Sequence, residues 1–352
     1  RQREKPYYHS GSQVWRNSGL EFPRMTLLVV ITVDLENPQT PLRTGFCKSN
    51  LFAPIINGQH LGYLMILRIM RQFRVRGVFF VNVYEAALWG DHALQAVCQQ
   101  IVNSGNEVGL HTHPEWSYDS ARIHMWQYSV GEQTKIVADG LAMLMRWIPG
   151  CVVVAHRAGA YGLNKDTLIA LRKNSIPIDS SMFYGHPNCR LTWSHNQVVE
   201  RDGILEIPIT GFFREEILEL LGIPIRHHIS FVKTDIDAAS LEELKFFVQE
   251  AKKHDIRVMN LFLHSYSFIR FNSDFSHFEP DWQDIEKFER FLEFATSDQS
   301  IKFVTMKELY EMYQRDPGIL LDGSDYVPVY RYQVNLTDKI KRKLMSRIGK
   351  WC

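Results

Sequence analysis

The sequence predicts an α/β protein folded as a distorted (β/α) barrel of seven or eight units. Short apolar runs alternate with amphipathic stretches from Leu27 almost to the end of the 352-residue chain, a pattern typical of a parallel sheet covered by helices. No Gly-x-Gly-x-x-Gly follows any apolar run, so an open dinucleotide-binding sheet would lack its phosphate-binding turn. We found no internal repeat. These observations favour a barrel over an open, doubly wound sheet.

Buried strands are expected where short runs rich in β-branched and aromatic residues are bounded by polar turns. In chain order we expect strands at 27–32, 77–82, 107–110, 152–155, 176–179, 203–209, 257–263 and 301–304.

Helices are expected where apolar residues recur at three- and four-residue spacing. In chain order they are 61–73, 91–104, 129–147, 164–174, 240–253, 281–295 and a last helix from 305. Asp91 is a candidate N-cap, and Ser129-Val-Gly-Glu132 and Ser240-Leu-Glu-Glu243 are capping boxes. The region 188–225 resembles an insertion, either shaping a pocket or lying on the surface.

Composition narrows the class of protein. A net charge of +1 gives no electrostatic case for a nucleic-acid partner. The five scattered cysteines lack Cys-x-x-Cys spacing, which favours a reducing compartment over a disulfide framework. The longest apolar run, 27–33, is too short to span a bilayer, and residues 1–24 contain no signal-peptide core. We therefore expect a cytoplasmic location.

The expected domain organisation has three parts: an N-terminal extension (1–24), a barrel domain (25–315) and a C-terminal extension (316–352). The end of the chain, 339–352, carries six basic residues and no acidic one. Ile340, Leu344 and Ile348 recur at four-residue spacing. Such a basic amphipathic helix is either a solvated terminal helix or a peripheral contact with the inner face of a membrane.

Ionisable side chains follow five separated strands, at the point where each strand ends. They are Asp34, Glu36, His111, His113, Arg157, Asp179 and His264. In a parallel barrel all strands end on one face, where the active site is built. We therefore expect these side chains to converge.

The convergent set contains the groups needed to hydrolyse an amide or an ester. A carboxylate and two imidazoles make a divalent-metal site with positions left open for water, the catalytic rather than the structural pattern. Such a metal activates water and polarises a carbonyl. A second carboxylate can act as general base and a further imidazole as general acid. Arg157 would keep the base ionised, and Asp179 would orient the acid imidazole.

These residues occur in five motifs whose order resembles the polysaccharide deacetylases, the NodB-homology or carbohydrate esterase 4 type. The five segments are Thr32-Val-Asp-Leu-Glu36, His111-Thr-His-Pro-Glu115, Arg157-Ala-Gly-Ala-Tyr161, Asp179-Ser-Ser181 and Leu261-Phe-Leu-His-Ser265. The resemblance covers about residues 27–310 and implies a distorted (β/α) barrel.

The resemblance also implies roles. Asp34 would be the general base. Glu36, His111 and His113 would bind a divalent metal, most simply Zn²⁺, with Glu115 as the alternative third ligand. Glu36 would replace the family's second Asp, because Leu35 stands at that position and cannot bind a metal.

The remaining residues of the motifs complete the implied site. Arg157, Asp179 and His264 would be the partner of the base, the orienting carboxylate and the general acid. Tyr161 and Leu263 would contact substrate. In the third motif Gly159 stands where the family has Pro, and Tyr161 comes one residue late.

The expected function is that of a metal-dependent deacetylase acting on carbon–nitrogen bonds other than peptide bonds. It would remove an acetyl group from an N- or O-acetylated sugar during assembly of a glycan or surface polysaccharide. The alternative is a non-catalytic barrel of the same fold that binds a carbohydrate without hydrolysing it.

Overall fold

The computed structural model describes residues 26–38, 54–56, 58–220, 223–272 and 278–335. Within them, one curled sheet of nine strands forms a half-barrel, in the order β12-β1-β4-β5-β6-β7-β9-β8 with β15 also paired to β1. All pairs are parallel except β8 with β9. The strands are β1 (Leu27–Leu35), β4 (Gly77–Asn82), β5 (Glu107–Thr112), β6 (Ala155–Ala158), β7 (Ile178–Asp179), β8 (Val199–Arg201), β9 (Ile204–Glu206), β12 (Val258–His264) and β15 (Ile301–Phe303). The predicted distorted barrel is confirmed.

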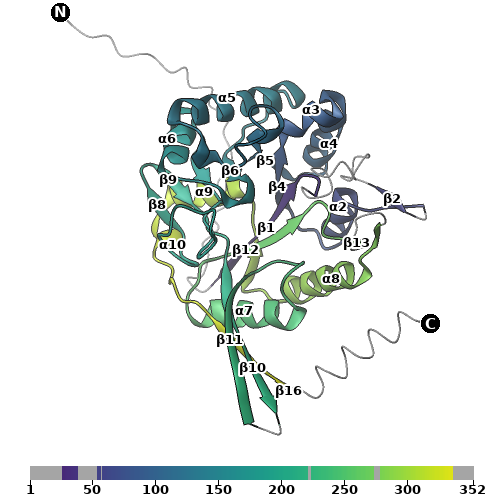
Figure 1. Cartoon of the computed structure of the whole chain (residues 1–352), viewed down its shortest axis with the longest axis vertical. Helices are drawn as coiled ribbons and strands as arrows, with labels where there is room; N and C mark the ends of the chain where they lie inside the picture. The colour runs from purple at the N-terminus through teal and green to yellow at the C-terminus, as the bar shows by residue number, and fades with distance from the viewer. Residues whose placement is uncertain (1–25, 39–53, 57, 221–222, 273–277, 336–352) are drawn as a thin grey trace, which may run out of the picture.

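Helices cover the outer side of this sheet (Figure 1), and α9 and α10 close the end at which its strands begin. They are α2 (Tyr63–Gln72), α3 (Ala86–Trp89), α4 (Asp91–Asn103), α5 (Val130–Trp147), α6 (Lys165–Lys173), α7 (Leu241–Lys253), α8 (Trp282–Ser297), α9 (Met306–Arg315) and α10 (Gly318–Leu321). The capping boxes at Ser129 and Ser240 are formed as predicted. The predicted cap at Asp91 is wrong, because Gly90, with φ +81°, is the N-cap.

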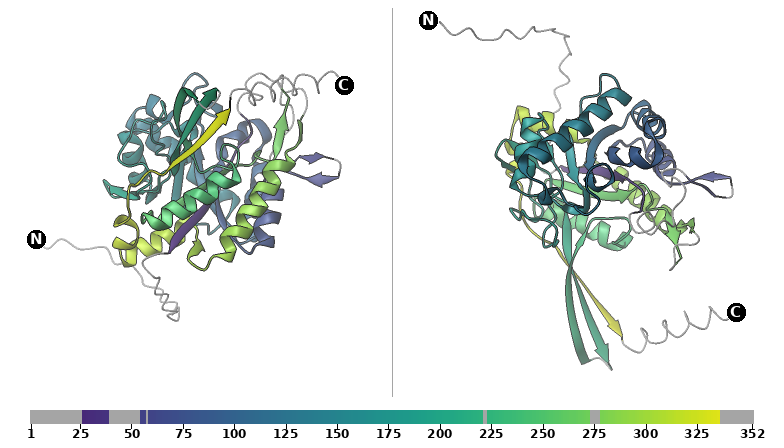
Figure 2. Two further views of the ribbon diagram at one scale, coloured as in Figure 1. Left: turned by 90° about the horizontal axis from the view of Figure 1, so that it is seen from below. Right: turned by 45° about the horizontal axis from the view of Figure 1, so that its top comes forward.

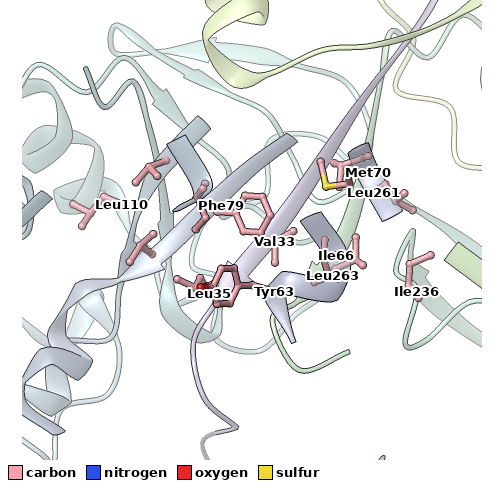
Figure 3. Packing of buried hydrophobic residues seen from close by; sticks show 14 of the residues in the cluster. Val33, Leu35, Tyr63, Ile66, Met70, Phe79, Leu110, Ile236, Leu261 and Leu263 are labelled. Carbon is pink, nitrogen blue, oxygen red and sulfur yellow. The ribbon is translucent and has the colours of Figure 1, made fainter. Parts of the chain in front are cut away.

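Side-chain alternation along β1 separates two buried regions. Val29, Ile31 and Val33 face outward into the main core with the helices, whereas Leu28 and Val30 face the barrel interior. Figure 3 shows part of the main core. The lower end of the interior is filled by apolar side chains of α9 and α10, so the polar side chains collect at the opposite end, where the strands finish.

The half-barrel is completed by irregular backbone rather than by a further ladder. The Thr234 N–H donates to the Thr210 carbonyl, and the Phe262 N–H donates to the Thr234 carbonyl, both at 2.9 Å. The Thr234 hydroxyl also donates to the Asn260 carbonyl at 2.7 Å. The segment around Thr234 therefore bridges the gap between β12 and the chain that follows β9, which is why the barrel is distorted.

A three-stranded arm projects from the barrel and was not predicted (Figures 1 and 2). It contains β10 (Gly211–Leu220), β11 (Ile223–Lys233) and β16 (Val329–Asn335), in the order β11-β10-β16. Two short hairpins pair β2 (Ile55–Ile56) with β3 (Gln59–His60) and β13 (Ile269–Phe271) with β14 (Phe278–Pro280). Part of the predicted insertion at 188–225 is thus one strand of the arm.

The C-terminal extension contributes β16, which pairs in parallel with β10. The segments 1–24 and 339–352 lie outside the described residues, so the membrane contact stays a prediction, as do the domain division and the cytoplasmic location. In the part of the chain that the structure describes, no helix is long and apolar enough to cross a membrane.

A buried polar cluster lies on the outer side of the sheet, between β5, β6, β7 and β9. His156 Nδ1 lies 2.6 Å from Asp179 Oδ1, and His156 Nε2 lies 3.0 Å from the Thr112 hydroxyl. Glu206 also belongs to this cluster. Burial, and then the neighbouring Asp179 carboxylate, raise the pKa of Glu206 well above its usual value.

Glu206 should therefore make stability depend on pH. A carboxyl whose pKa is raised on folding favours the folded state least at high pH, because the unfolded chain ionises freely there. Glu206→Gln can still donate to Asp179 but cannot ionise. Its melting temperature relative to wild type should rise steadily between pH 5 and pH 8. A difference independent of pH would contradict the assignment of a neutral, buried Glu206.

Candidate active site

At the upper end of the barrel interior, Arg157 is fully buried and bonded on every side. Its Nη1 donates to Asp34 Oδ1 at 2.7 Å, and its Nε donates to the Ser180 carbonyl at 2.9 Å. Its Nη2 donates to the hydroxyls of Thr32 and Ser180, each at 3.0 Å. The guanidinium also lies over the ring of Phe80, 4.3 Å from its centroid. The predicted pairing of Arg157 with Asp34 is thus present.

Two imidazoles and one carboxylate meet beside Asp34. His111, on β5, and His113, just after it, both point their Nε2 atoms at Glu36, which follows β1. Glu36 Oε2 lies 2.8 Å from His113 Nε2 and 3.4 Å from His111 Nε2. Asp34 Oδ2 lies 3.7 Å from His111 Nε2. All four side chains are buried, so the predicted convergence is observed for these residues.

The far side of each imidazole is held by a hydrogen bond. His111 Nδ1 lies 2.9 Å from the Arg157 carbonyl, and His113 Nδ1 lies 3.0 Å from Glu115 Oε1. A carbonyl can only accept, so His111 carries its proton on Nδ1 and its Nε2 is left as an electron-pair donor. A carboxylate behind the imidazole, as Glu115 is behind His113, commonly orients histidines that bind metals.

Glu36 and His113 shift each other's pKa in the direction that keeps both charged. Burial favours the neutral acid, but the facing imidazole of His113 outweighs it and holds the pKa of Glu36 well below its usual value. Burial disfavours imidazolium, but Glu36 and Glu115 outweigh it and raise the pKa of His113 well above its usual value. Glu36 is therefore ionised, as a metal ligand must be, and a bound cation would take the place of the His113 proton.

These donors suit a divalent metal ion. One ligand atom from each of Glu36, His111 and His113 lies within 4.8 Å of the others. His111 Nε2 is buried and makes no hydrogen bond in the described structure, which is the state expected of a ligand atom. The described residues thus include a possible metal site made of the three predicted ligands. Glu115 lies behind His113, in the place of a supporting carboxylate.

Gly159, where the resemblance would place Pro, packs directly against His113. A Cβ atom at this position would fall 2.5 Å from His113 Nε2. No side chain other than hydrogen fits there without moving the imidazole. Glycine at position 159 therefore leaves the space that the His113 imidazole occupies.

His264 ends β12, the strand beside β1, and is paired in register with Asp34. Its Nδ1 is 3.3 Å from Asp237 Oδ2, and the Ser267 hydroxyl donates to the same oxygen at 3.0 Å. Burial lowers the pKa of an imidazole, but the hydrogen bond to Asp237 outweighs it and raises the pKa of His264. Asp237, which the sequence did not indicate, is the carboxylate that orients His264.

The predicted role of Asp179 as the partner of His264 is therefore wrong. Asp179 bonds to His156 on the outer side of the sheet. Adjacent residues of a strand point to opposite faces, so Arg157 faces the interior while His156 and its partner Asp179 face outward.

Leu263 is likewise misassigned as a substrate contact. It is fully buried in the main core with Val33 and Ile66, beneath the helices (Figure 3). The neighbouring Phe262 is the one that faces the interior. Its ring lies 3.7 Å from Lys233 Nζ and 4.7 Å from the guanidinium carbon of Arg157, measured to the ring centroid.

Tyr161 lies at the mouth of the site, on a turn with unusual backbone. Ala160 and Tyr161 have φ of +47° and +59°, a left-handed conformation that costs non-glycine residues roughly 1–3 kcal/mol. Lys233 Nζ donates to the Tyr161 hydroxyl at 3.0 Å and lies 2.5 Å from Asp235 Oδ2. Lys233 and Asp235, which the sequence did not indicate, thus hold Tyr161 in place.

Comparison with known proteins places the fold in one class. No family model and no curated protein matches the sequence. Among solved structures, the chain is similar to a protein assigned as a polysaccharide deacetylase from Mycobacterium smegmatis. That match has a TM-score of 0.56 and 15% identity, over 87% of this chain and 96% of that one.

Two further structures are similar over 84% of this chain and 93% of theirs, each with a TM-score of 0.51. One is assigned as a polysaccharide deacetylase from Pseudomonas aeruginosa PAO1, at 12% identity, and the other is the allantoinase PuuE, at 11%. The fold is therefore that of the polysaccharide deacetylases, as the order of motifs implied.

Substituting His113 and Glu115 in turn should show which of the two binds the metal and which only supports the other. His113→Ala should weaken binding of Zn²⁺ by about 100-fold or more, whereas Glu115→Gln should weaken it by about 10-fold, because a neutral amide behind the imidazole supports it less than a carboxylate. Isothermal titration of the metal-free proteins measures both. A larger loss for Glu115→Gln than for His113→Ala would make Glu115 the ligand instead.

The packing of Gly159 gives a second test of the same site. Gly159→Ala should displace the His113 imidazole and lower the affinity for Zn²⁺ by about 10-fold or more, since ligand orientation controls affinity. Gly131→Ala is the control, because a Cβ there meets nothing within 4 Å. Equal metal affinity in the Gly159→Ala and Gly131→Ala proteins would show that His113 is not a ligand.

Proposed function

We propose that the protein is a metal-dependent deacetylase that removes an acetyl group from an acetylated sugar or saccharide. The observation that carries this proposal is the convergence of Glu36, His111 and His113 beside the Asp34–Arg157 pair, with His264 at the end of the neighbouring strand. A site with two imidazoles and one carboxylate leaves positions open for water and substrate, as catalytic metal sites do.

The residues around the metal position would have different roles in catalysis. The bound metal would supply an activated water and polarise the carbonyl of the acetyl group. Asp34 uses Oδ1 to accept from Arg157 and presents Oδ2 toward the metal ligands. It can therefore accept the proton of the attacking water, and Arg157 holds it in position while it does so.

His264 has the position and the partner of a general acid. It ends the strand next to that of Asp34, and its Nδ1 faces Asp237. That leaves Nε2 to deliver a proton to the leaving amine or alcohol. Since the pKa of His264 is raised, the imidazole keeps its proton to higher pH than an ordinary histidine.

The substrate proposal rests on the fold and on the mouth of the site. Tyr161, Phe183 and His186 group there, with ring centroids 4.7–5.4 Å apart, and aromatic rings stack on sugar faces. An allantoinase has a similar fold, so the fold alone leaves the amide undefined. We propose an acetamido or acetylated sugar, Zn²⁺ as the metal, and a role in glycan assembly.

The activity can be tested by acetate release. The Zn²⁺-loaded protein, incubated with N-acetylglucosamine oligomers and with O-acetylated xylan, should release acetate from one of them. Asp34→Asn should bind Zn²⁺ normally and lose about 10²–10⁴-fold in kcat, as expected for a general base. Binding of these saccharides without release of acetate would instead support the non-catalytic carbohydrate-binding barrel.

The pH–rate profile tests the acid. Activity should fall at high pH as His264 loses its proton, with an apparent pKa above the ordinary value of about 6.5. Asp237→Asn removes the charge that favours imidazolium, so this limb should move to lower pH by about one unit. Asp179→Asn is the control and should leave the limb unmoved. If Asp179→Asn shifts the limb and Asp237→Asn does not, the assignment of Asp237 is wrong.

A further inference from the structure

Glu36 lies beyond the end of the regular sheet. The β1–β4 ladder ends at Leu35, paired with Val81. Glu36 and Asn37 therefore lie past this ladder, where Glu36 presents its carboxylate to two imidazoles. Side chains from other elements anchor the backbone here.

One anchor is the side chain of Ser265, from the end of β12. Its hydroxyl donates to the Glu36 carbonyl at 2.6 Å and accepts from the Glu36 N–H at 3.3 Å. The Ser265 N–H also donates to the Asp34 carbonyl at 2.9 Å. These bonds fix one side of the Asp34–Glu36 segment.

The other anchor is Glu85, a fully buried carboxylate on η1 (Val83–Glu85), directly after β4. Its Oε1 accepts from the Asn37 N–H at 2.9 Å and from Asn82 Nδ2 at 3.1 Å. Its Oε2 accepts from Asn37 Nδ2 at 2.7 Å and from Trp89 Nε1 at 3.0 Å. Four N–H donors therefore surround both oxygens, and two of the four belong to the residue that follows Glu36.

We propose that Glu85 is a positioning residue for the metal site: by anchoring Asn37 it fixes the backbone of Glu36 so that the Glu36 carboxylate meets His111 and His113. This inference rests on the proposed role of Glu36 as a ligand. Its physical basis is that only an ionised carboxylate can accept all four N–H groups at once.

The test substitutes Glu85 by its isostere and measures the affinity for Zn²⁺. Glu85→Gln turns an –NH₂ group toward two of the four donors, so one of the two bonds from Asn37 is lost whichever way the amide points, while the volume is kept. We expect the dissociation constant for Zn²⁺ to rise by about 10- to 100-fold, as when a supporting group of a metal ligand is removed. The Co²⁺-loaded variant should also show a changed visible absorption spectrum, since the Glu36 carboxylate is displaced. Burial raises the pKa of Glu85 to about 7, although its donors oppose this, so titrations should be done at pH 8.

Glu107→Gln is the matched control. Glu107 begins β5, at the opposite end of that strand from His111, and burial likewise raises its pKa to about 7. One of its oxygens accepts from the Lys307 N–H at 3.0 Å. Glu107→Gln should leave both the Zn²⁺ affinity and the Co²⁺ spectrum unchanged.

A wild-type affinity and spectrum in Glu85→Gln would overturn the inference. If wild type itself binds no Zn²⁺, the proposed function fails before this inference is reached. Should Glu85→Gln not fold, Asn37→Ala decides, because it removes one of the four donors and leaves Glu85 in place. A weaker Zn²⁺ affinity in Asn37→Ala supports the anchor, and an unchanged affinity overturns it.

Discussion

The site depends on one buried cation. Arg157 has no exposed surface, and a guanidinium in such a place is tolerated only when its charge and its N–H groups are all matched. Asp34 supplies the charge, while Thr32 and Ser180 supply acceptors. These partners come from β1 and from the segment after β7, so satisfying Arg157 draws separate strands to fixed positions. The Arg157 carbonyl also sets the orientation of His111.

This constraint explains how the two halves of the site are joined. Asp34 is held by the Arg157 guanidinium and approaches His111, which bonds to the Arg157 carbonyl, so the proposed base and a proposed metal ligand are both positioned by Arg157. Glu36 follows two residues later, where the Glu85 and Ser265 anchors replace the sheet. The acid side, His264 with Asp237, is held separately by β12 and the bridging segment. Asp34, His111 and His264 thus lie on strands, and Glu36 and His113 directly follow strands.

Much of this arrangement was predictable, because the signal lay in strand ends. Asp34, Glu36, His111, His113, Arg157 and His264 each follow or end an apolar run, and the C-terminal ends of parallel strands meet at one rim. The order of the motifs then gave the fold class, which the solved structures support.

The wrong assignments concern residues that lie on the other face of the sheet from the site. Asp179 and Leu263 stand at strand ends, yet each points away from the interior, since neighbouring side chains alternate. Alternation along a strand could have shown this from the sequence. If Arg157 faces the interior, its neighbour His156 must face outward.

Asp237 and Lys233 could not be found from the sequence. Lys233 ends β11, a strand with mostly exposed side chains that shows no buried-strand pattern, and Asp237 belongs to the irregular segment that follows it. Because β11 lacks an apolar pattern, nothing in the sequence marks the residues that complete the barrel.

The most direct test of the account is X-ray absorption spectroscopy at the metal edge of the Zn²⁺-reconstituted protein. The structure predicts two imidazole nitrogens at about 2.0–2.1 Å together with oxygen ligands. It also predicts that His111→Ala and His113→Ala each remove one imidazole from the scattering. A coordination shell without imidazole, or one that is unchanged in both variants, would contradict the assignment of Glu36, His111 and His113 as the metal site.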